Sequence, residues 1–304
     1  SGRVTLWADG RDFHLMGADG RDLYPPDSSA GFEGCERYER TAALIDMPAD
    51  ENFYVVDIFR VKGGKDHTKF VSSQFGNVAL EGVSLQFDEE YGYNTQMRNF
   101  KRDPSPSFGW RATWQIDDRY GYLSANMQVY LLYTDLSNGT EVGLGEAWVV
   151  EGDYRKSTEA WIPRLMVRRR SPQGRLESTF VSIMHPFVKK SAIKSINRLH
   201  LYTPHGREVS ESDVGIEIIH SDGTADIFIL ADVFPEGNVK WSSGDVLIHK
   251  ERKIRLEGKA AFLRRNKKGR YVYVSLYCGN AVSVNGEEFT QDKKSNFTEW
   301  VLEE

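Results

Sequence analysis

Short runs of β-branched and aromatic residues recur along the chain, and each run is about as long as a β-strand. Turn-forming pairs such as Gly63-Gly64 and Asn285-Gly286 stand between these runs. Such a pattern predicts antiparallel strands joined by tight turns. We expect strands at residues 53–61, 121–134, 164–169, 178–184, 214–220, 225–233 and 270–278.

The last of these runs shows the alternation of side chains most clearly. Successive side chains of a strand point to opposite faces, so Tyr271, Tyr273 and Tyr277 would share one face. Val272 and Val274 would lie on the other, more apolar face. The alternation predicts a half-buried antiparallel strand with one face in the core.

Helical periodicity is weak, and residues 186–195 are the one modest helical candidate. The sequence therefore predicts an all-β fold in which many antiparallel strands stack as two sheets. Lys189-Lys190-Ser191 interrupts the strand pattern, so we expect a domain boundary there. The predicted domains are a large antiparallel β-sandwich (super-sandwich) at residues 1–188 and a smaller C-terminal β-sheet domain at residues 189–304.

The composition is that of a globular protein with a sizeable core. Of the 304 residues, 40% are hydrophobic and 12% are aromatic, so a core can form without metal or disulfide staples. The 39 basic and 44 acidic residues give a net charge of −5, which argues against a nucleic-acid partner. No apolar run approaches the ~20 residues of a membrane span. Cys35 and Cys278 show no metal or redox spacing, so two free thiols are the simpler interpretation, and a single disulfide stays open.

His67 has the most distinctive context of the seven histidines. It follows an apolar strand and the turn Gly63-Gly64, where a ligand can approach the backbone closely. Lys65 and Lys69 flank it, would favour a polyanion nearby and, if close in space, would lower the pKa of the imidazole. A neutral imidazole can accept a proton in acid–base catalysis. The competing interpretation is an ordinary solvated histidine in a charged turn.

Motifs for other chemistries are missing from the sequence. The remaining histidines form no HxH or HExxH pair, so no metal site is predicted. No P-loop, dinucleotide-binding glycine motif or GxSxG elbow occurs, which disfavours nucleotide-dependent enzymes and α/β hydrolases. We therefore expect neither a metal nor an organic cofactor.

Two further features suggest contacts to an acidic sugar. In the run RLMVRRR at residues 164–170, Arg168 and Arg170 share one face of a strand and can bind carboxylate or sulfate groups, while Arg169 points to the other face. Alternatively, these charges protect an edge strand from aggregation. Trp110 belongs to an aromatic-rich stretch in which most rings should form the core, and one or two could line a groove.

Two segments resemble heparinase II/III-type polysaccharide lyases. Residues 38–70 (YERTAALIDMPADENFYVVDIFRVKGGKDHTKF) are similar to the part of that family in which a strand with the pattern VDxFRVxGG leads to a histidine. Residues 165–186 (LMVRRRSPQGRLESTFVSIMHP) are similar to a family stretch of arginines followed by a strand and a proline. Both segments lie in the first two-thirds of the chain.

The resemblance implies the β-sandwich and C-terminal β region of such a lyase, with an α-helical toroid domain upstream in the native chain. It implies β-elimination on an acidic, uronate-containing polysaccharide, in a periplasmic or secreted protein. The matching position makes His67 the expected catalytic residue, closing the cleft opposite the toroid. Because β-elimination requires the uronate carboxylate to be neutralised, basic side chains near the substrate are expected. The residues expected to bind the substrate are Lys65, Lys69, Arg168, Arg170 and Trp110.

The chain departs from the family pattern shortly after His67. Family members often have a further histidine there, whereas this chain has Ser72 and Ser73 among the residues that follow. A second hypothesis therefore stays open, namely a module that binds acidic glycan or supports structure without catalysis. A third hypothesis is a scaffold for protein partners.

Overall fold

The structure is nearly all β, which confirms the predicted fold class. In the part of the chain that the structure describes, two short 3-10 helices accompany the strands and there is no α-helix. No helix among these residues has the length and hydropathy needed to cross a membrane. The 3-10 helices are η1 (Arg21–Leu23) and η2 (Tyr93–Thr95). This computed structural model describes residues 2–23, 25–26, 34–48, 52–124, 127–151, 158–232, 246–292 and 294–302.

The chain divides into two compact units, and the main boundary follows residue 191. A short N-terminal segment, residues 8–14, belongs to the second unit. The division expected from the sequence places this segment in the first domain. The reason is aromatic packing, because the rings of Phe13 and Phe262 stack with centroids 5.2 Å apart. The first unit contains residues 1–7 and 15–191, and the second contains residues 8–14 and 192–304.

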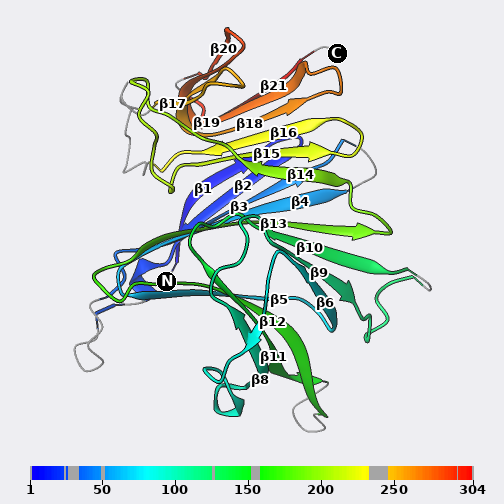
Figure 1. Cartoon of the computed structure of the whole chain (residues 1–304). Coiled ribbons are helices and arrows are strands. Elements are labelled where there is room, and N and C mark those ends of the chain that lie inside the picture. Colours follow the sequence, from blue (N-terminus) through cyan, green and yellow to red (C-terminus); the bar gives the residue numbers. More distant parts are fainter. Residues whose placement is uncertain are drawn as a thin grey trace. The chain divides into compact units, whose positions relative to one another are not determined.

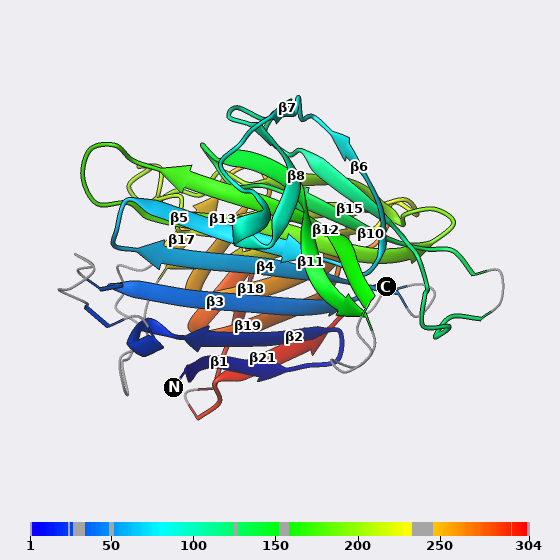
Figure 2. The same cartoon turned by 90° about the horizontal axis from the view of Figure 1, so that it is seen from below.

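An eight-stranded sheet forms one layer of the first unit, in the order β1-β2-β3-β4-β13-β10-β9-β6. Figure 2 shows β1 to β4 side by side in this sheet. Most side chains of β4 are buried on both faces, as its near-continuous apolar sequence predicts. The strands are β1 (Arg3–Asp9), β2 (Phe13–Asp19), β3 (Arg37–Asp46), β4 (Phe53–Lys62), β13 (Glu177–Val188), β10 (Val129–Asp135), β9 (Arg111–Ile116) and β6 (Gly76–Glu81).

A five-stranded sheet in the order β5-β12-β11-β8-β7 forms the second layer of the first unit, and Figure 1 shows it beneath the eight-stranded sheet. The two layers enclose one core, in which Trp114 and Tyr133 of the first sheet meet Leu165 and Val167 of the second. This arrangement is the β-sandwich that the sequence predicts. The strands are β5 (Asp66–Ser72), β12 (Thr158–Arg170), β11 (Glu141–Glu151), β8 (Met97–Asp103) and β7 (Gln86–Phe87).

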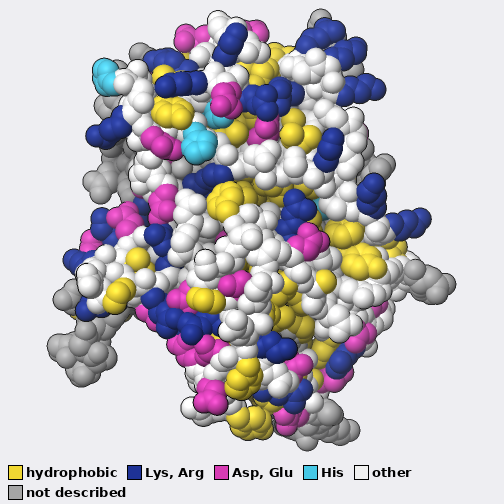
Figure 3. All heavy atoms as spheres, in the orientation of Figure 1, with side chains coloured by type: hydrophobic (Ala, Val, Ile, Leu, Met, Phe, Trp, Pro, Cys, Tyr) yellow, Lys and Arg dark blue, Asp and Glu magenta, His cyan; other side chains and the backbone are white. Residues whose placement is uncertain are grey.

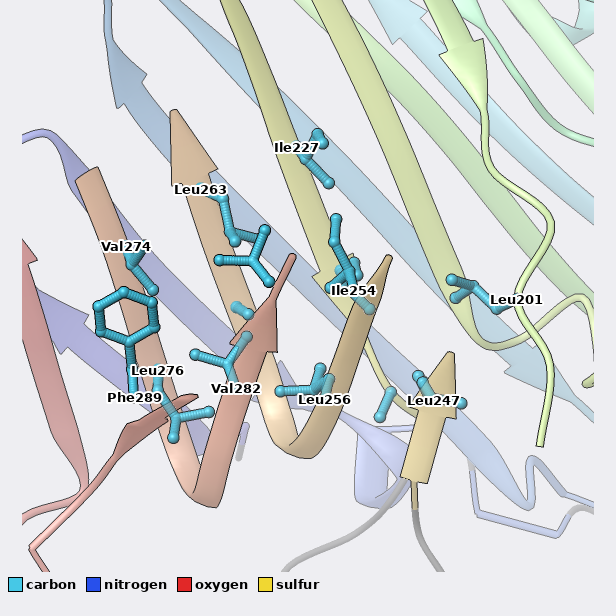
Figure 4. Close-up of a cluster of buried hydrophobic side chains, with 14 residues drawn as sticks. Leu201, Ile227, Leu247, Ile254, Leu256, Leu263, Val274, Leu276, Val282 and Phe289 are labelled. Atoms are coloured by element: carbon cyan, nitrogen blue, oxygen red, sulfur yellow. The ribbon is translucent and has the colours of Figure 1, made fainter. Parts of the chain in front are cut away.

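A third sheet forms the second unit. Six of its strands follow the order β14-β15-β16-β18-β19-β20, while β17 pairs with β18 and β21 pairs with β19. One face carries a cluster of buried aliphatic side chains with Phe289 among them (Figure 4). The strands are β14 (Ile193–Arg198), β15 (Val214–His220), β16 (Ala225–Leu230), β17 (Val246–His249), β18 (Ile254–Arg265), β19 (Tyr271–Val284), β20 (Glu287–Thr290) and β21 (Phe297–Val301).

The strand β19 is buried on both faces, so the expectation of a half-buried strand is wrong. Val274 and Leu276 lie in the apolar cluster of the second unit. Tyr273 and Tyr277 on the opposite face are buried as well. The Tyr273 hydroxyl donates a hydrogen bond of 2.6 Å to Glu299, which satisfies its polar atom. Alternating tyrosine and valine therefore does not distinguish a solvated face from a covered one.

Two expected elements are also wrong. Residues 186–195 form no helix, because β13 continues to Val188 and β14 begins at Ile193. Lys189, between the two strands, has a φ of 66°, a left-handed conformation that suits a turn. Among the described residues, the strand expected from residue 121 begins at Val129, as β10, and residues 125–126 lie outside the described part of the chain. For residues 186–195, the pairing of β13 and β14 with their neighbouring strands outweighs the weak helical periodicity.

Candidate functional site

The double-glycine turn before His67 has the backbone that the sequence predicts. Gly63 and Gly64 have φ values of 109° and 71°, where glycine is strongly favoured. The Gly63 amide donates to the Leu176 carbonyl at 3.1 Å, and the Leu176 amide donates to the Gly64 carbonyl at 2.9 Å. The turn is thus fastened to the connection between β12 and β13, and it places His67 at the start of β5.

The imidazole of His67 is 5% exposed and lies between the two sheets of the sandwich. Its Nε2–H donates to the carbonyl of Gly63, because a carbonyl oxygen can only accept. Nδ1 therefore accepts a hydrogen bond of 2.9 Å from the hydroxyl of Ser178. Burial lowers the pKa of His67 below its ordinary value, so the ring is neutral at pH 7.

His67 lines a cavity of about 260 Å³ within the first unit, together with Tyr38, Cys35 and Gly64. A neighbouring cavity of about 520 Å³ shares Gly34 and Cys35 with it, so the two hollows lie next to each other. The histidine is thus beside a concave surface although both of its nitrogen atoms are engaged by protein groups.

The two lysines that flank His67 have different environments. Lys69 is 7% exposed, and its Nζ lies 2.5 Å from Oδ2 of Asp57 and 2.9 Å from Oγ of Ser182. It therefore neutralises a carboxylate inside the sandwich and does not face solvent. Lys65 is exposed at the turn, and it has no ion pair with any residue that the structure describes.

Arg168 and Arg170 share the outer face of β12, as the alternation predicts, but each is paired with carboxylates. Arg168 donates to Asp66 at 2.7 Å and to Glu90 at 2.6 Å, and Arg170 lies 2.8 Å from Glu141. Basic and acidic side chains also lie next to each other over the lower part of the face in Figure 3. The predicted ridge is therefore an ion-pair network whose charges are largely balanced.

Trp110 lies inside the sandwich and is 3% exposed. Its ring centroid is 5.4 Å from that of Tyr133, with the planes tilted by 41°. A buried indole offers no face to a sugar ring, so Trp110 contributes to packing in this structure.

The structure describes no group of three or more histidine, cysteine, aspartate or glutamate side chains that could hold a metal ion. Cys35 and Cys278 are both free thiols, in agreement with the simpler interpretation of the sequence. Burial raises the pKa of each thiol, so neither is an activated nucleophile.

Comparison with known proteins gives only distant, structural similarity. No protein-family model matches the chain, and no curated protein matches it. Among solved structures, a mutant of the heparan sulfate lyase HepC from Pedobacter heparinus is similar over 72% of this chain, with 14% sequence identity and a TM-score of 0.38. The match spans 26% of the length of the HepC chain. At these values the relation is structural and distant, and it assigns no activity to this chain.

Sequence reasoning missed three residues around the candidate site. Ser178, which holds Nδ1 of His67, is 111 residues away along the chain, so no local pattern indicates it. Tyr38 lines the cavity from β3, which reaches the site only through strand pairing. Asp66 could have been found, because it precedes His67 directly and must point to the opposite face of β5, where Arg168 lies.

Proposed function

We propose that this chain is the β-sandwich portion of a polysaccharide lyase that cleaves an acidic, uronate-containing glycan by β-elimination. The observation that carries the proposal is the position of His67, the histidine of the segment that resembles the lyases, which lines a cavity beside a double-glycine turn. The resemblance of residues 38–70 and 165–186 to that family supports the same assignment. The proposal includes an upstream α-helical toroid in the native chain and a periplasmic or secreted location.

The proposed role of His67 is proton transfer or hydrogen bonding to the substrate. In β-elimination a base removes the proton beside the uronate carboxylate, and the glycosidic bond breaks with its electron pair leaving on the 4-oxygen. A neutral imidazole suits this chemistry, and the burial of His67 lowers its pKa. To act, the ring must exchange its bond to Ser178 or to the Gly63 carbonyl for one to the substrate.

Lys65 is the proposed partner of the substrate carboxylate. It is the exposed cation of the turn, whereas Lys69 is committed to a buried aspartate. The ammonium group offsets the negative charge of the substrate carboxylate. The negative charge that develops when the neighbouring carbon loses its proton is therefore repelled less, and the transition state is stabilised. Arg168 and Arg170 would join only if the substrate displaced their carboxylate partners.

A second candidate function is binding of acidic glycan without catalysis. The observation that favours it is that both nitrogens of His67 already bond to protein, so the ring has no free lone pair. The serines at positions 72 and 73, near where the family often has a second histidine, point the same way.

The test uses protein expressed from the complete coding sequence, incubated with a panel of uronate-containing polysaccharides. Release of the unsaturated product is followed by its ultraviolet absorbance. We expect turnover on at least one glycan and a loss of at least about 100-fold in His67→Gln, the usual effect of removing a positioned acid or base. The control is His205→Gln, an exposed histidine of the second unit, which should retain full activity.

The same panel separates the two candidate functions. Absence of product from every glycan would refute the catalytic proposal. The binding module would then be favoured if the chain binds immobilised acidic glycan, if His67→Gln leaves the affinity unchanged and if Lys65→Gln weakens it.

A further inference from the structure

The second unit contains a cavity of about 450 Å³, within the size range of small-molecule sites. Its wall is built by the segment after β14, by β15 and by the turn that follows β17. Tyr202 and Ile248 exchange two backbone hydrogen bonds of 2.8 Å, which fix two sides of the cavity against each other. The Leu199 amide donates to the Gly215 carbonyl at 2.8 Å and ties the first segment to β15.

His249 supplies a hydrogen-bond donor to the lining of this cavity. The residue is 4% exposed, and its Nδ1 accepts a hydrogen bond of 3.1 Å from the backbone amide of Arg252. The proton of the neutral ring is therefore on Nε2. Burial lowers the pKa of His249, which keeps this tautomer neutral at pH 7. Among the residues that the structure describes, Nε2–H has no protein acceptor.

Basic side chains accompany this donor. The Nζ of Lys250 lies 4.3 Å from the ring centroid of Tyr202 and has no carboxylate partner in the described part of the chain. Arg252 donates one bond of 2.9 Å to the buried Glu217, and Arg265 from outside the lining bonds the same carboxylate at 2.7 Å. Glu217 is thus neutralised twice. The lining contains one further carboxylate, Glu251, against the basic side chains of Arg198, Lys250 and Arg252, so basic groups outnumber acidic ones. Figure 3 shows histidine, basic and acidic side chains together on the part of the second unit near β17.

We propose that this cavity binds a small ligand bearing an oxyanion group, which Lys250, Arg252 and the Nε2–H of His249 recognise. A carboxylate, sulfate or phosphate offers acceptor oxygens and a negative charge to these donors, whereas a neutral sugar would leave the ammonium charge unused. The 450 Å³ volume leaves room for a body the size of a sugar ring next to the oxyanion. All three recognition groups belong to the second unit, so the inference does not depend on the role of His67.

The test is calorimetric titration of the full chain with inorganic phosphate, inorganic sulfate, glucuronate and glucose. We expect saturable binding of at least one of the three anions and none of glucose at the same millimolar concentration. Phosphate or sulfate alone identifies an inorganic-ion site, and glucuronate alone identifies a carboxylated sugar. The absence of saturable binding by all three anions would overturn the proposal, as would equal binding of glucose.

Three variants test the assignment of the recognition groups. Lys250→Gln should weaken anion binding about tenfold, the effect of losing one charge-assisted hydrogen bond. The matched control is Lys268→Gln, an exposed lysine of the β18–β19 turn, which should bind like the parent chain. His249→Asn can still accept the Arg252 amide but lacks the Nε2 donor, so it should also bind more weakly. Parent-like binding by both Lys250→Gln and His249→Asn would place the anion elsewhere and refute the assignment.

Discussion

The buried ion pair between Lys69 and Asp57 predicts an asymmetric response to substitution. The two side chains are 6% and 1% exposed, and Nζ lies 2.5 Å from Oδ2. Asp57 has a second partner, because Arg40 donates to it at 2.6 and 3.2 Å. Lys69 is also 2.9 Å from the hydroxyl of Ser182 and 5.7 Å from the ring of Tyr133, and its charge acts on the buried Asp135.

The magnitudes follow from what each substitution leaves behind. Asp57→Ala removes the carboxylate that is bonded to the buried ammonium group, and it should cost about 3–5 kcal/mol of unfolding free energy. Lys69→Met fills similar space with an apolar chain and leaves Asp57 bonded by Arg40, so about 1–3 kcal/mol is expected. The double variant removes both charges together and should cost less than the sum of the single variants by more than about 1 kcal/mol.

The assay is urea unfolding followed by tryptophan fluorescence. Trp110 and Trp114 are buried in the core of the same sandwich, so unfolding of the unit that contains the ion pair changes the fluorescence. Lys101→Met, at an exposed position of β8, is the matched control and should change the unfolding free energy by less than about 0.5 kcal/mol.

Two results would refute this reasoning. The first is a cost of Asp57→Ala no greater than that of Lys69→Met, and the second is additivity in the double variant. Glycan binding gives an independent check, because a lysine committed to Asp57 should not contribute to it. The folded Lys69→Met variant should therefore bind glycan with the same affinity as the parent chain. A large loss of affinity would indicate that Lys69 contacts the substrate.

Three further predictions concern the same unit. Because the pKa of His67 is lowered on folding, the unfolded chain binds the proton more tightly. The stability is therefore full above pH 6.5 and falls as the pH drops below it; His67→Gln should flatten this part of the stability–pH curve, whereas His205→Gln, at an exposed position, should not. Gly63→Ala should lower the unfolding free energy in urea by about 1–3 kcal/mol, because φ is 109° and the new Cβ would lie 3.0 Å from a carbonyl oxygen. Gly64→Ala has open space around the new Cβ, so it should lower the unfolding free energy by only about 1 kcal/mol. Trp110→Ala should cost about 3–5 kcal/mol of stability and leave glycan binding by the folded protein unchanged; weakened binding with little loss of stability would contradict its place in the core.

The sequence by itself determined the local features of this protein. The β-branched runs predict most strands, and the pair Gly63-Gly64 predicts a turn because only glycine readily adopts its φ values. Alternation along β12 also predicts that Arg168 and Arg170 share a face, since this follows from the geometry of a single strand.

Only the tertiary structure decided which charges are available to a ligand. Arg168 meets Glu90, which is 78 residues away in sequence, and Lys69 meets Ser182, which is 113 residues away. Such partners are set by sheet order and by the packing of two layers, which no local pattern encodes. The same packing encloses Trp110 and leaves Lys65 exposed at the turn, because burial depends on what the opposite sheet supplies at each position.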